Sequence, residues 1–286
     1  MTIEKNKYVL NLAPNGVMPT KALTPHVPTT PQEVVADLKE CMNAGGITYL
    51  HLHARDENGE NTSSKTIYAK YIDAIKNEFE HLPICVSCSG RIDPSFEKRA
   101  EVLNLQGDLK PDMASLTLGS LNFSKTASIN SPDTIVRLAE KMAEQNIKPE
   151  LEIFDVGMMN FAQYMISKGY LKTPYYFNII LGNLFSAQAK ESHLKIILDE
   201  MPKNSIWSIG GIGNAQQPAH LMAFKNGGGI RTGIEDNIWL DDERTQLATN
   251  ASLVKRIHDM NKNSEMMDMI SFKSFLLDKN PPVMRA

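Results

Sequence analysis

Long apolar runs, basic runs and paired cysteines are scarce in this 286-residue chain, and each absence excludes a class of protein. No apolar stretch reaches the length of a membrane span, and residues 1–7 lack the apolar core of a signal peptide. The net charge is −3 and no Lys/Arg-rich run stands out, which argues against a nucleic-acid or membrane partner. Three cysteines do not make a disulfide framework. We therefore expect a cytoplasmic protein that binds small molecules.

Short apolar segments alternate with longer amphipathic segments along the whole chain. One helix should begin at Pro31, with Thr30 as N-cap and Glu33 at capping-box spacing, and another at Pro132 after the N-cap Ser131. Eight βα units in about 250 residues predict an α/β fold of the (β/α)8 TIM-barrel type, with an open doubly wound sheet as the alternative. The expected strands are 8–12, 48–53, 84–87, 113–117, 150–154, 176–181, 206–209 and 229–233.

The C-terminal segment exceeds what eight βα units need. We expect a single TIM-barrel domain over residues 1–286, with the barrel at about 8–261 and a C-terminal extension at 262–286. The extension carries Met266, Met267, Met269, Phe272 and Phe275. Such an apolar segment is expected to pack on the barrel or on a neighbouring subunit.

Two histidines two residues apart, His51 and His53, end a segment that alternates like a β-strand. Alternate side chains of a strand share a face, so both imidazoles should point one way and Leu50 and Leu52 the other. Two adjacent imidazoles are able to chelate one cation, and an acidic turn after the last strand offers Glu235 as a third ligand. Two histidines, one carboxylate and an open position are typical of a catalytic zinc site. The alternative is a pair of partly buried histidines hydrogen-bonded to loops.

Polar residues end most of the expected strands. Active sites of TIM barrels lie at the C-terminal ends of the strands, so these side chains should converge on one rim. The candidates are His51, His53, Ser87, Ser115, Thr117, Glu152, Asp155, Asn183, Arg231 and Glu235.

A series of short motifs follows the chain from about Asn11 to Ser252. They are Asn15-Gly16 with Thr20-Lys21, Pro28-Thr-Thr-Pro31, His51-Leu-His53-Ala-Arg55-Asp56, Ser87 with Gly90, Ser95-Phe-Glu-Lys-Arg99, Lys110-Pro-Asp-Met-Ala-Ser115, Gly119-Ser-Leu-Asn-Phe123, Pro149-Glu-Leu-Glu152 with Gly157-Met158, Gly211-Ile-Gly213 and Ile230-Arg-Thr-Gly-Ile-Glu-Asp-Asn237. In this order and at these strand ends, the motifs resemble those of the zinc-dependent β-keto acid cleavage enzymes.

The resemblance implies a zinc ion held by His51, His53 and Glu235, the same set that the strand pattern favours. It also implies a reaction in which a β-keto acid and acetyl-CoA give acetoacetate and a new acyl-CoA by a Claisen-type condensation. The resemblance assigns catalytic roles to Asp236 as base, Arg231 as its partner and Glu152 as a further acid. Hydrogen bonds to the substrate are assigned to Ser87, Ser115 and Thr117. The family also suggests a homotetramer.

Two further expectations concern the substrates. Met18 stands where the aminohexanoate-cleaving relative has an acidic residue that recognises an amino group, so we expect a β-keto acid with a neutral or apolar tail. Coenzyme A needs a phosphate site, and the N–H groups of Gly211 and Gly213 at a helix start are candidates. The same glycines would equally serve close packing of strand on helix.

Three other functions remain as alternatives. A metal-dependent aldolase or lyase acting on a keto acid without CoA would have a similar sequence pattern. A metal-dependent hydrolase of the amidohydrolase kind is less favoured, because its histidine pair belongs on the first strand. A barrel that binds metabolites without turnover is disfavoured by Arg231 and Asp236 beside the ligand set.

Overall fold

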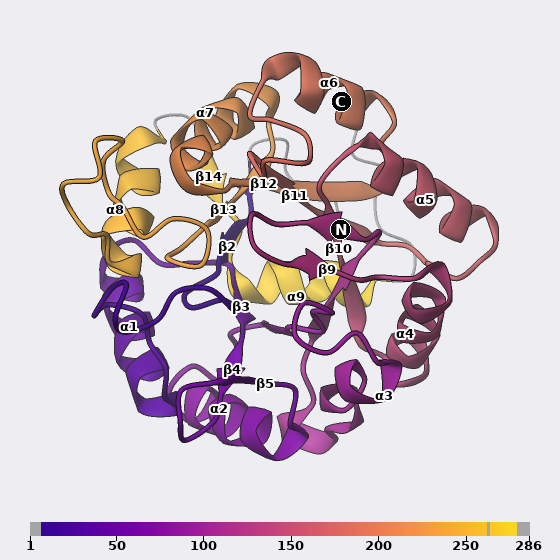
Figure 1. Ribbon diagram of the computed structural model, residues 1–286, viewed down its shortest axis with the longest axis horizontal. Helices are drawn as coiled ribbons and strands as arrows, with labels where there is room; N and C mark the ends of the chain where they lie inside the picture. The colour runs from indigo at the N-terminus through magenta and orange to yellow at the C-terminus, as the bar shows by residue number, and fades with distance from the viewer. Residues whose placement is uncertain (1–6, 262–263, 279–286) are drawn as a thin grey trace.

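The computed structural model describes residues 7–261 and 264–278 and has a closed barrel of eight parallel strands at its centre (Figure 1). The sheet closes in the order β10-β11-β12-β13-β2-β3-β6-β7, which confirms the TIM barrel and excludes the open sheet. The strands are β2 (Leu10–Leu12), β3 (Tyr49–Leu52), β6 (Ile84–Val86), β7 (Met113–Thr117), β10 (Lys148–Ile153), β11 (Tyr175–Leu181), β12 (Ser205–Gly211) and β13 (Gly229–Thr232).

Helices surround the barrel and connect its strands (Figure 1). They are α1 (Pro31–Asn43), α2 (Lys65–Glu78), the short α3 (Phe96–Arg99), α4 (Pro132–Glu144), α5 (Val156–Ser167), α6 (Glu191–Asp199), α7 (Gln216–Asn226) and α8 (Asn250–Met260). Ser131 caps α4 as expected. Thr30 caps α1, but the Glu33 carboxylate accepts hydrogen bonds from Thr29 instead of returning to the N-cap itself.

The two faces of the barrel strands have different partners. Leu50 and Leu52 point outward into the large apolar core between the sheet and its helices, whereas His51 lies on the inner face. Cys85 belongs to a second cluster inside the barrel and Cys88 to the outer core, so the two thiols face opposite ways. The predicted alternation of side chains along these strands is therefore confirmed.

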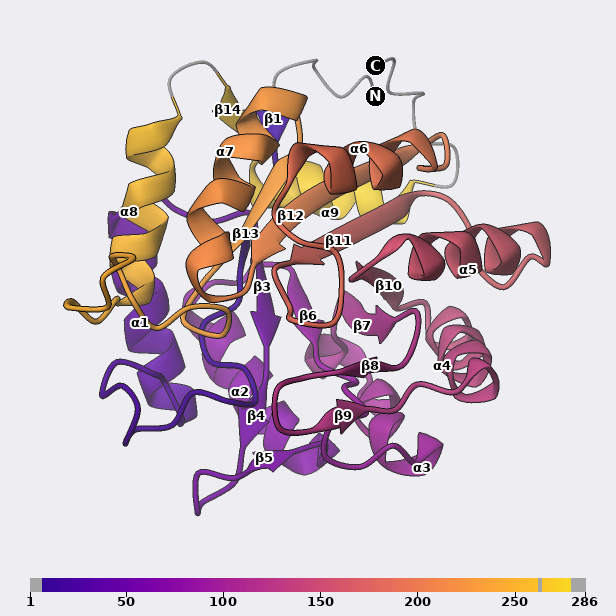
Figure 2. The ribbon, with the colours of Figure 1, turned by 45° about the horizontal axis from the view of Figure 1, so that its top comes forward.

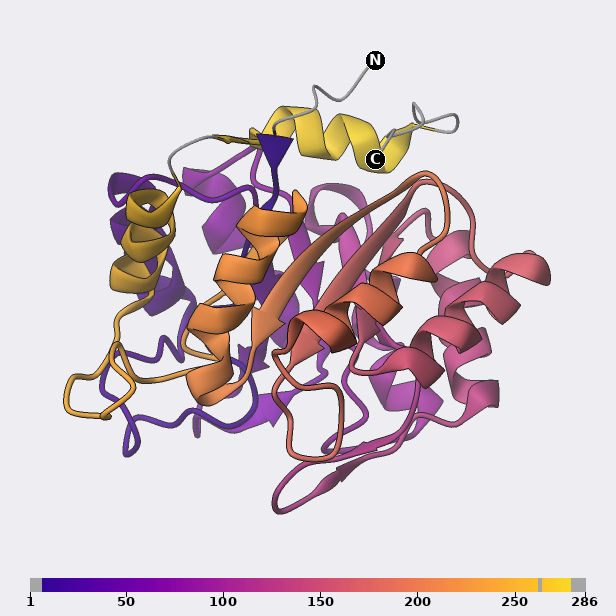
Figure 3. The same cartoon turned by 90° about the horizontal axis from the view of Figure 1, so that it is seen from above.

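The described part of the C-terminal extension closes the N-terminal end of the barrel. The parallel pair β1 (Lys7–Tyr8) and β14 (Glu265–Met266) leads to α9 (Met269–Leu277), which lies across the strand starts (Figure 3). The Phe272 ring is fully buried and stacks on Tyr49 with 5.0 Å between ring centroids. Residues 262–263 and 279–286 of the predicted extension lie outside the described residues.

Two small hairpins project at the other end of the barrel (Figure 2). They are β4 (Ala54–Arg55) with β5 (Asn61–Thr62), and β8 (Leu121–Asn122) with β9 (Ala127–Ser128). Each follows a barrel strand, so both hairpins frame the end where the strands finish. None of the helices in the described ranges is long and apolar enough to cross a membrane.

Candidate active site

The three predicted metal ligands meet at the C-terminal rim of the barrel. His51 lies on β3, His53 follows directly after it, and Glu235 follows β13. The Nε2 atoms of the two histidines are 3.4 Å apart, and Glu235 Oε1 is 3.5 Å from His53 Nε2. All three ligand atoms lie within 4.8 Å of one another. The spacing of the histidines and the acidic turn thus come together as the sequence predicts.

The donor atoms of this cluster fit a zinc ion. His51 Nδ1 lies 2.6 Å from Glu150 Oε2, a contact that leaves Nε2 facing His53 and Glu235. Glu235 Oε2 is buried, has no hydrogen-bond partner and lies 3.9 Å from His51 Nε2. An unpartnered buried carboxylate oxygen is costly without a cation beside it. Two imidazoles and one carboxylate are the donor set of catalytic zinc sites.

Glu150 is the main functional residue that the sequence interpretation missed. Its carboxylate is fully buried at the centre of the barrel, where Oε1 accepts hydrogen bonds from Tyr49, Asn11 and Asn178. Burial raises the pKa of Glu150, but the charge of His51 and the hydrogen bonds from His51 and Tyr49 lower it by more. The pKa therefore falls from 4.5 to about 2. Glu150 is therefore an anion that orients His51 from behind. The signal was present, because Glu150 is two residues before Glu152 and must share its face of the strand.

The charge on His51 follows from the same contact. Burial lowers the pKa of His51, but the Glu150 and Glu235 carboxylates raise it more strongly, to about 9. Burial lowers the pKa of His53, which keeps this imidazole neutral. The raised pKa favours the cationic form of His51 and the lowered pKa favours the neutral form of His53, and a bound cation would displace the proton from His51 Nε2.

Short loops hold the histidine pair and Glu235 together. The Asn15 amide donates to the His53 carbonyl at 2.8 Å and accepts from the His53 N–H at 3.2 Å. Gly16 has a φ of +61°, and a Cβ there would lie 2.3 Å from Glu235 Cγ, so only glycine lets the Glu235 side chain pass. Asn250 accepts from the Ile234 N–H at 2.9 Å and fixes the turn that carries Glu235.

Arg231 connects the candidate metal ligand Glu235 to Asp236. Its guanidinium donates to both Asp236 oxygens, at 2.8 and 3.1 Å, and lies 2.9 Å from Glu235 Oε1. Arg231 lowers the pKa of Asp236, but burial raises it by more, so the pKa lies above its usual value. The pair therefore positions a carboxylate without removing its basicity.

Glu152 and Thr117 form a second acidic contact on the same inner surface. The Thr117 hydroxyl donates to Glu152 Oε2 across the paired strands β7 and β10. Burial and the nearby charge of Glu150 raise the pKa of Glu152. Glu152 is thus a candidate proton donor, while Glu150, two residues away, stays ionised.

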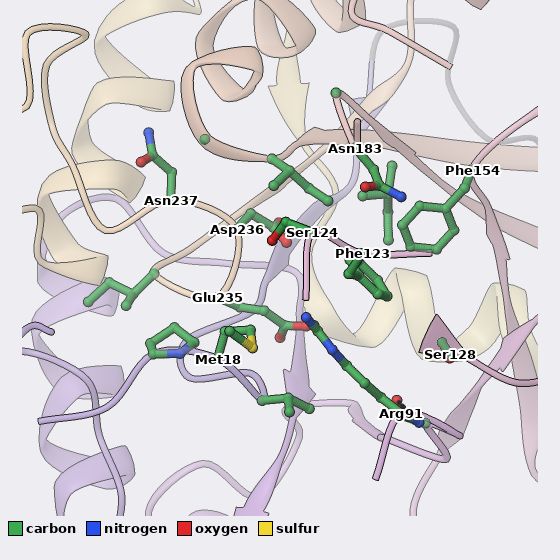
Figure 4. A pocket seen from close by; sticks show the side chains of 18 of the residues that line it. Met18, Arg91, Phe123, Ser124, Ser128, Phe154, Asn183, Glu235, Asp236 and Asn237 are labelled. Carbon is green, nitrogen blue, oxygen red and sulfur yellow. Dashed lines mark hydrogen bonds between the residues drawn. The ribbon is translucent and has the colours of Figure 1, made fainter. Parts of the chain in front are cut away.

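A cavity of about 420 Å³ opens in front of these residues (Figure 4). It brings together most of the predicted site residues, with Met18 at its mouth and Asp236 and Glu235 on one wall. The predicted residues that line it are Met18, His53, Ser87, Thr117, Glu152, Asn183, Gly213, Arg231, Glu235 and Asp236. Ser115 does not line it, because its buried hydroxyl accepts the Cys88 N–H at 3.0 Å and stabilises the chain before Ser89.

The glycine-rich segment after β12 has a packing role. A Cβ on Gly211 would lie 2.2 Å from the Ala215 carbonyl oxygen, so Gly211 permits close contact between the strand end and the start of α7. The Gly213 N–H donates to the Asp236 carbonyl at 2.8 Å, and the Ile212 N–H donates to Leu181. The Gly213 N–H is therefore already bonded, and Gly211 is needed for close contact with Ala215, so the packing alternative is favoured over a phosphate site. Gly213 instead fixes the backbone of Asp236.

Fold and site together define a TIM-barrel protein with a candidate metal centre and an adjacent arginine–carboxylate pair at its catalytic end. A family model described as beta-keto acid cleavage enzyme matches residues 7–267. The chain belongs to this family of enzymes. It is 31% identical over 252 residues to the 3-keto-5-aminohexanoate cleavage enzyme of Acetoanaerobium sticklandii, covering 88% of this chain and 90% of the relative. It is 30% identical to the 3-oxoadipate:acetyl-CoA acetyltransferase of Cupriavidus necator, covering 87% and 86%.

Solved structures show the same fold. The apo structure of ObcA matches with a TM-score of 0.75 at 18% sequence identity. The match covers 88% of this chain and 65% of ObcA, so the chain spans slightly less than two thirds of that protein. At this identity the likeness supports the barrel architecture and no finer statement.

Proposed function

We propose that this enzyme is a zinc-dependent transferase that converts a β-keto acid and acetyl-CoA into acetoacetate and a new acyl-CoA. One observation carries the proposal: the His51, His53 and Glu235 cluster and the Arg231–Asp236 pair share a contact and open into the same cavity. Relatives named for 3-oxoadipate and for 3-dehydrocarnitine are likewise described as acting with acetyl-CoA.

The metal would be held by His51, His53 and Glu235. When bound, it would supply Lewis acidity toward a ketone oxygen and a fixed positive charge for the substrate. The protein supplies the rest of the arrangement. Glu150 holds His51 in one orientation, and Arg231 holds both Glu235 and Asp236.

Asp236 is the proposed base. It lines the cavity and is oriented by two hydrogen bonds from Arg231, so it is able to take the proton from the carbon between the ketone and the carboxylate. The resulting carbanion attacks the thioester carbonyl of acetyl-CoA and displaces the CoA thiolate. The thiolate then attacks the original ketone carbon, and the carbon–carbon bond breaks to release acyl-CoA. The acetoacetate carbanion recovers the proton.

Two hydroxyls and one acid complete the proposed site. Ser87 lines the cavity after β6, and Thr117 lines it while donating to Glu152. Within the described residues the Ser87 hydroxyl is free to donate, and a positioned donor of this kind contributes about 2.7–4 kcal/mol when aimed at developing negative charge. Ser115 acts one step away, through the backbone of the Ser87 segment.

The substrate tail is proposed to be neutral or apolar where it passes Met18. This thioether is partly exposed at the cavity mouth, with Leu23 and Pro19 beside it on the lining. Because residue 18 is a methionine, it offers no carboxylate to pair with an ammonium group in this part of the cavity. We also propose a cytoplasmic homotetramer, which stays a prediction from the family resemblance.

The test is acetoacetate formation by zinc-loaded protein with a panel of β-keto acids, with and without acetyl-CoA. His51→Ala and Glu235→Ala should lose zinc and activity together. Asp236→Asn should keep zinc and lose turnover by about 100-fold or more, while Asp242→Asn, an exposed neighbour in the same loop, serves as control. Product without acetyl-CoA would favour a lyase. Full activity of Asp236→Asn would remove the base assignment.

A further inference from the structure

Arg91 is a cation of the active-site cavity with no assigned role. It lies in the segment between β6 and α3 and lines the cavity, where its side chain extends toward Glu235 (Figure 4). Its guanidinium carbon lies 3.9 Å from the centroid of the Phe123 ring, and its Nε donates to Thr126 Oγ1 at 3.4 Å. The β8–β9 hairpin and its turn thus hold the side chain from one side.

The terminal nitrogens of Arg91 have no anionic partner within the described ranges 7–261 and 264–278. Arg231, another arginine on the cavity lining, differs in this respect: it is almost fully buried and paired with Asp236 and Glu235, and only its NH1 group has no hydrogen-bond partner in the described part of the chain. Burial lowers the pKa of Arg91, and the carboxylate of Glu235 opposes that effect without reaching ion-pair distance. A half-buried guanidinium facing a cavity is stabilised when an anion enters, because its fork of donors matches a carboxylate.

The segment that carries Arg91 is held rigidly. Arg99 is almost fully buried and donates from Nε to the Cys88 carbonyl at 2.7 Å. Its NH2 group donates to Asn130 Oδ1 at 2.7 Å, beyond the hairpin that contains Phe123. The Arg91 N–H itself donates to Ser89 Oγ at 3.2 Å. Arg91 is therefore positioned before any ligand binds, which lowers the entropy lost on binding.

We propose that Arg91 binds a carboxylate of the β-keto acid, an inference that rests on the proposed function. The metal cluster and Arg91 flank the same space, so a keto acid placed at His51, His53 and Glu235 would direct an acid group toward the guanidinium. This group is either the reacting carboxylate that every β-keto acid has or a second carboxylate at the far end of a tail that is neutral or apolar where it passes Met18. Both sources share the same chemistry, and the choice of probe separates them.

The experiment measures binding, so it does not depend on turnover. Zinc-loaded wild type, Arg91→Gln and Arg91→Lys are titrated by calorimetry with 3-oxohexanoate, which has one carboxylate, and with 3-oxoadipate, which has two. Arg137→Gln is the matched control, because Arg137 also lies 3.9 Å above a phenylalanine ring, that of Phe96, but on the outer surface. Acetyl-CoA is titrated separately into each protein.

Arg91→Gln should raise the dissociation constant by about 10- to 100-fold, the usual cost of losing a charged hydrogen bond. An effect on both acids identifies the reacting carboxylate, and an effect on 3-oxoadipate alone identifies a tail carboxylate. Arg91→Lys should retain part of the affinity, and it replaces Arg91→Gln if that variant does not fold.

Unchanged binding of both acids overturns the proposal. So does weaker binding of acetyl-CoA alone, which would place a CoA phosphate at Arg91. If no β-keto acid is turned over yet Arg91→Gln still weakens binding, only the proposed reaction fails.

Discussion

Replacement of Glu150 by glutamine should weaken metal binding without touching a metal ligand. The Glu150 carboxylate accepts three hydrogen bonds at Oε1 and faces His51 Nδ1 and the Cys85 thiol with Oε2. A glutamine would keep its carbonyl oxygen toward the three donors and turn its NH₂ toward His51. The imidazole would then carry its proton on Nε2, where the metal needs a lone pair.

The expected size follows from the contact that is lost. The 2.6 Å contact between His51 Nδ1 and Glu150 Oε2 is a charge-assisted hydrogen bond, worth about 1.5–3 kcal/mol. Zinc affinity should therefore fall by about 10- to 100-fold, measured by competition with a chromogenic chelator. Glu152→Gln is the matched control, because it makes the same substitution two residues along the same strand, at a carboxyl that contacts Thr117 instead of His51. Equal zinc affinities of Glu150→Gln and wild type would refute the orienting role of Glu150.

Three further variants test the barrel floor, a helix contact and the cavity mouth. Phe272→Ala should lower the free energy of unfolding in urea by about 3–5 kcal/mol, because the ring is fully buried against Tyr49; a loss below 1 kcal/mol would contradict this. Burial of the Asp37 carboxyl raises its pKa from 3.8 to about 7, although the hydrogen bond that Asn250 donates to it acts in the opposite direction. The folded protein thus loses stability as the pH rises through this interval. The difference in free energy of unfolding between Asp37→Asn and wild type should therefore be about 2–3 kcal/mol more favourable to the variant at pH 8 than at pH 5. The same difference at both pH values would refute the pKa shift. Met18→Glu should increase the kcat/KM ratio of an amino-bearing to an apolar β-keto acid, and an unchanged ratio would remove the specificity argument.

The barrel and the meeting of His51, His53 and Glu235 were predictable because local patterns determine them. Alternation along β3 fixes which way His51 and His53 point, and the barrel rule places them at the same rim as Glu235. The strand boundaries agree closely, since β7 spans Met113–Thr117 as predicted and β11 begins one residue before the predicted start. Helix starts were predictable for the same reason, because Ser131 caps the residues next to it in sequence.

The remaining features depend on contacts between distant segments. Nothing near Ser115 in the sequence indicates that the backbone N–H of Cys88, 27 residues away, donates a hydrogen bond to its hydroxyl. The partner of the Gly213 N–H is the Asp236 carbonyl, on the next strand-end loop. The pKa of Asp236 is set by how completely the carboxyl is buried, which a sequence does not display. These quantities require the assembled barrel.

The inside of the barrel is divided into layers that serve different purposes. An apolar layer at the floor packs Tyr49 and Tyr176 on Phe272. The next layer is polar, with Glu150 reaching across from β10 to Asn11 on β2 and His51 on β3. Buried ion pairs are seldom favourable for stability compared with apolar side chains of the same volume. The retention of a carboxylate and an imidazole here is therefore better explained by the rim above them, where the proposed metal site requires His51 to be held in one orientation.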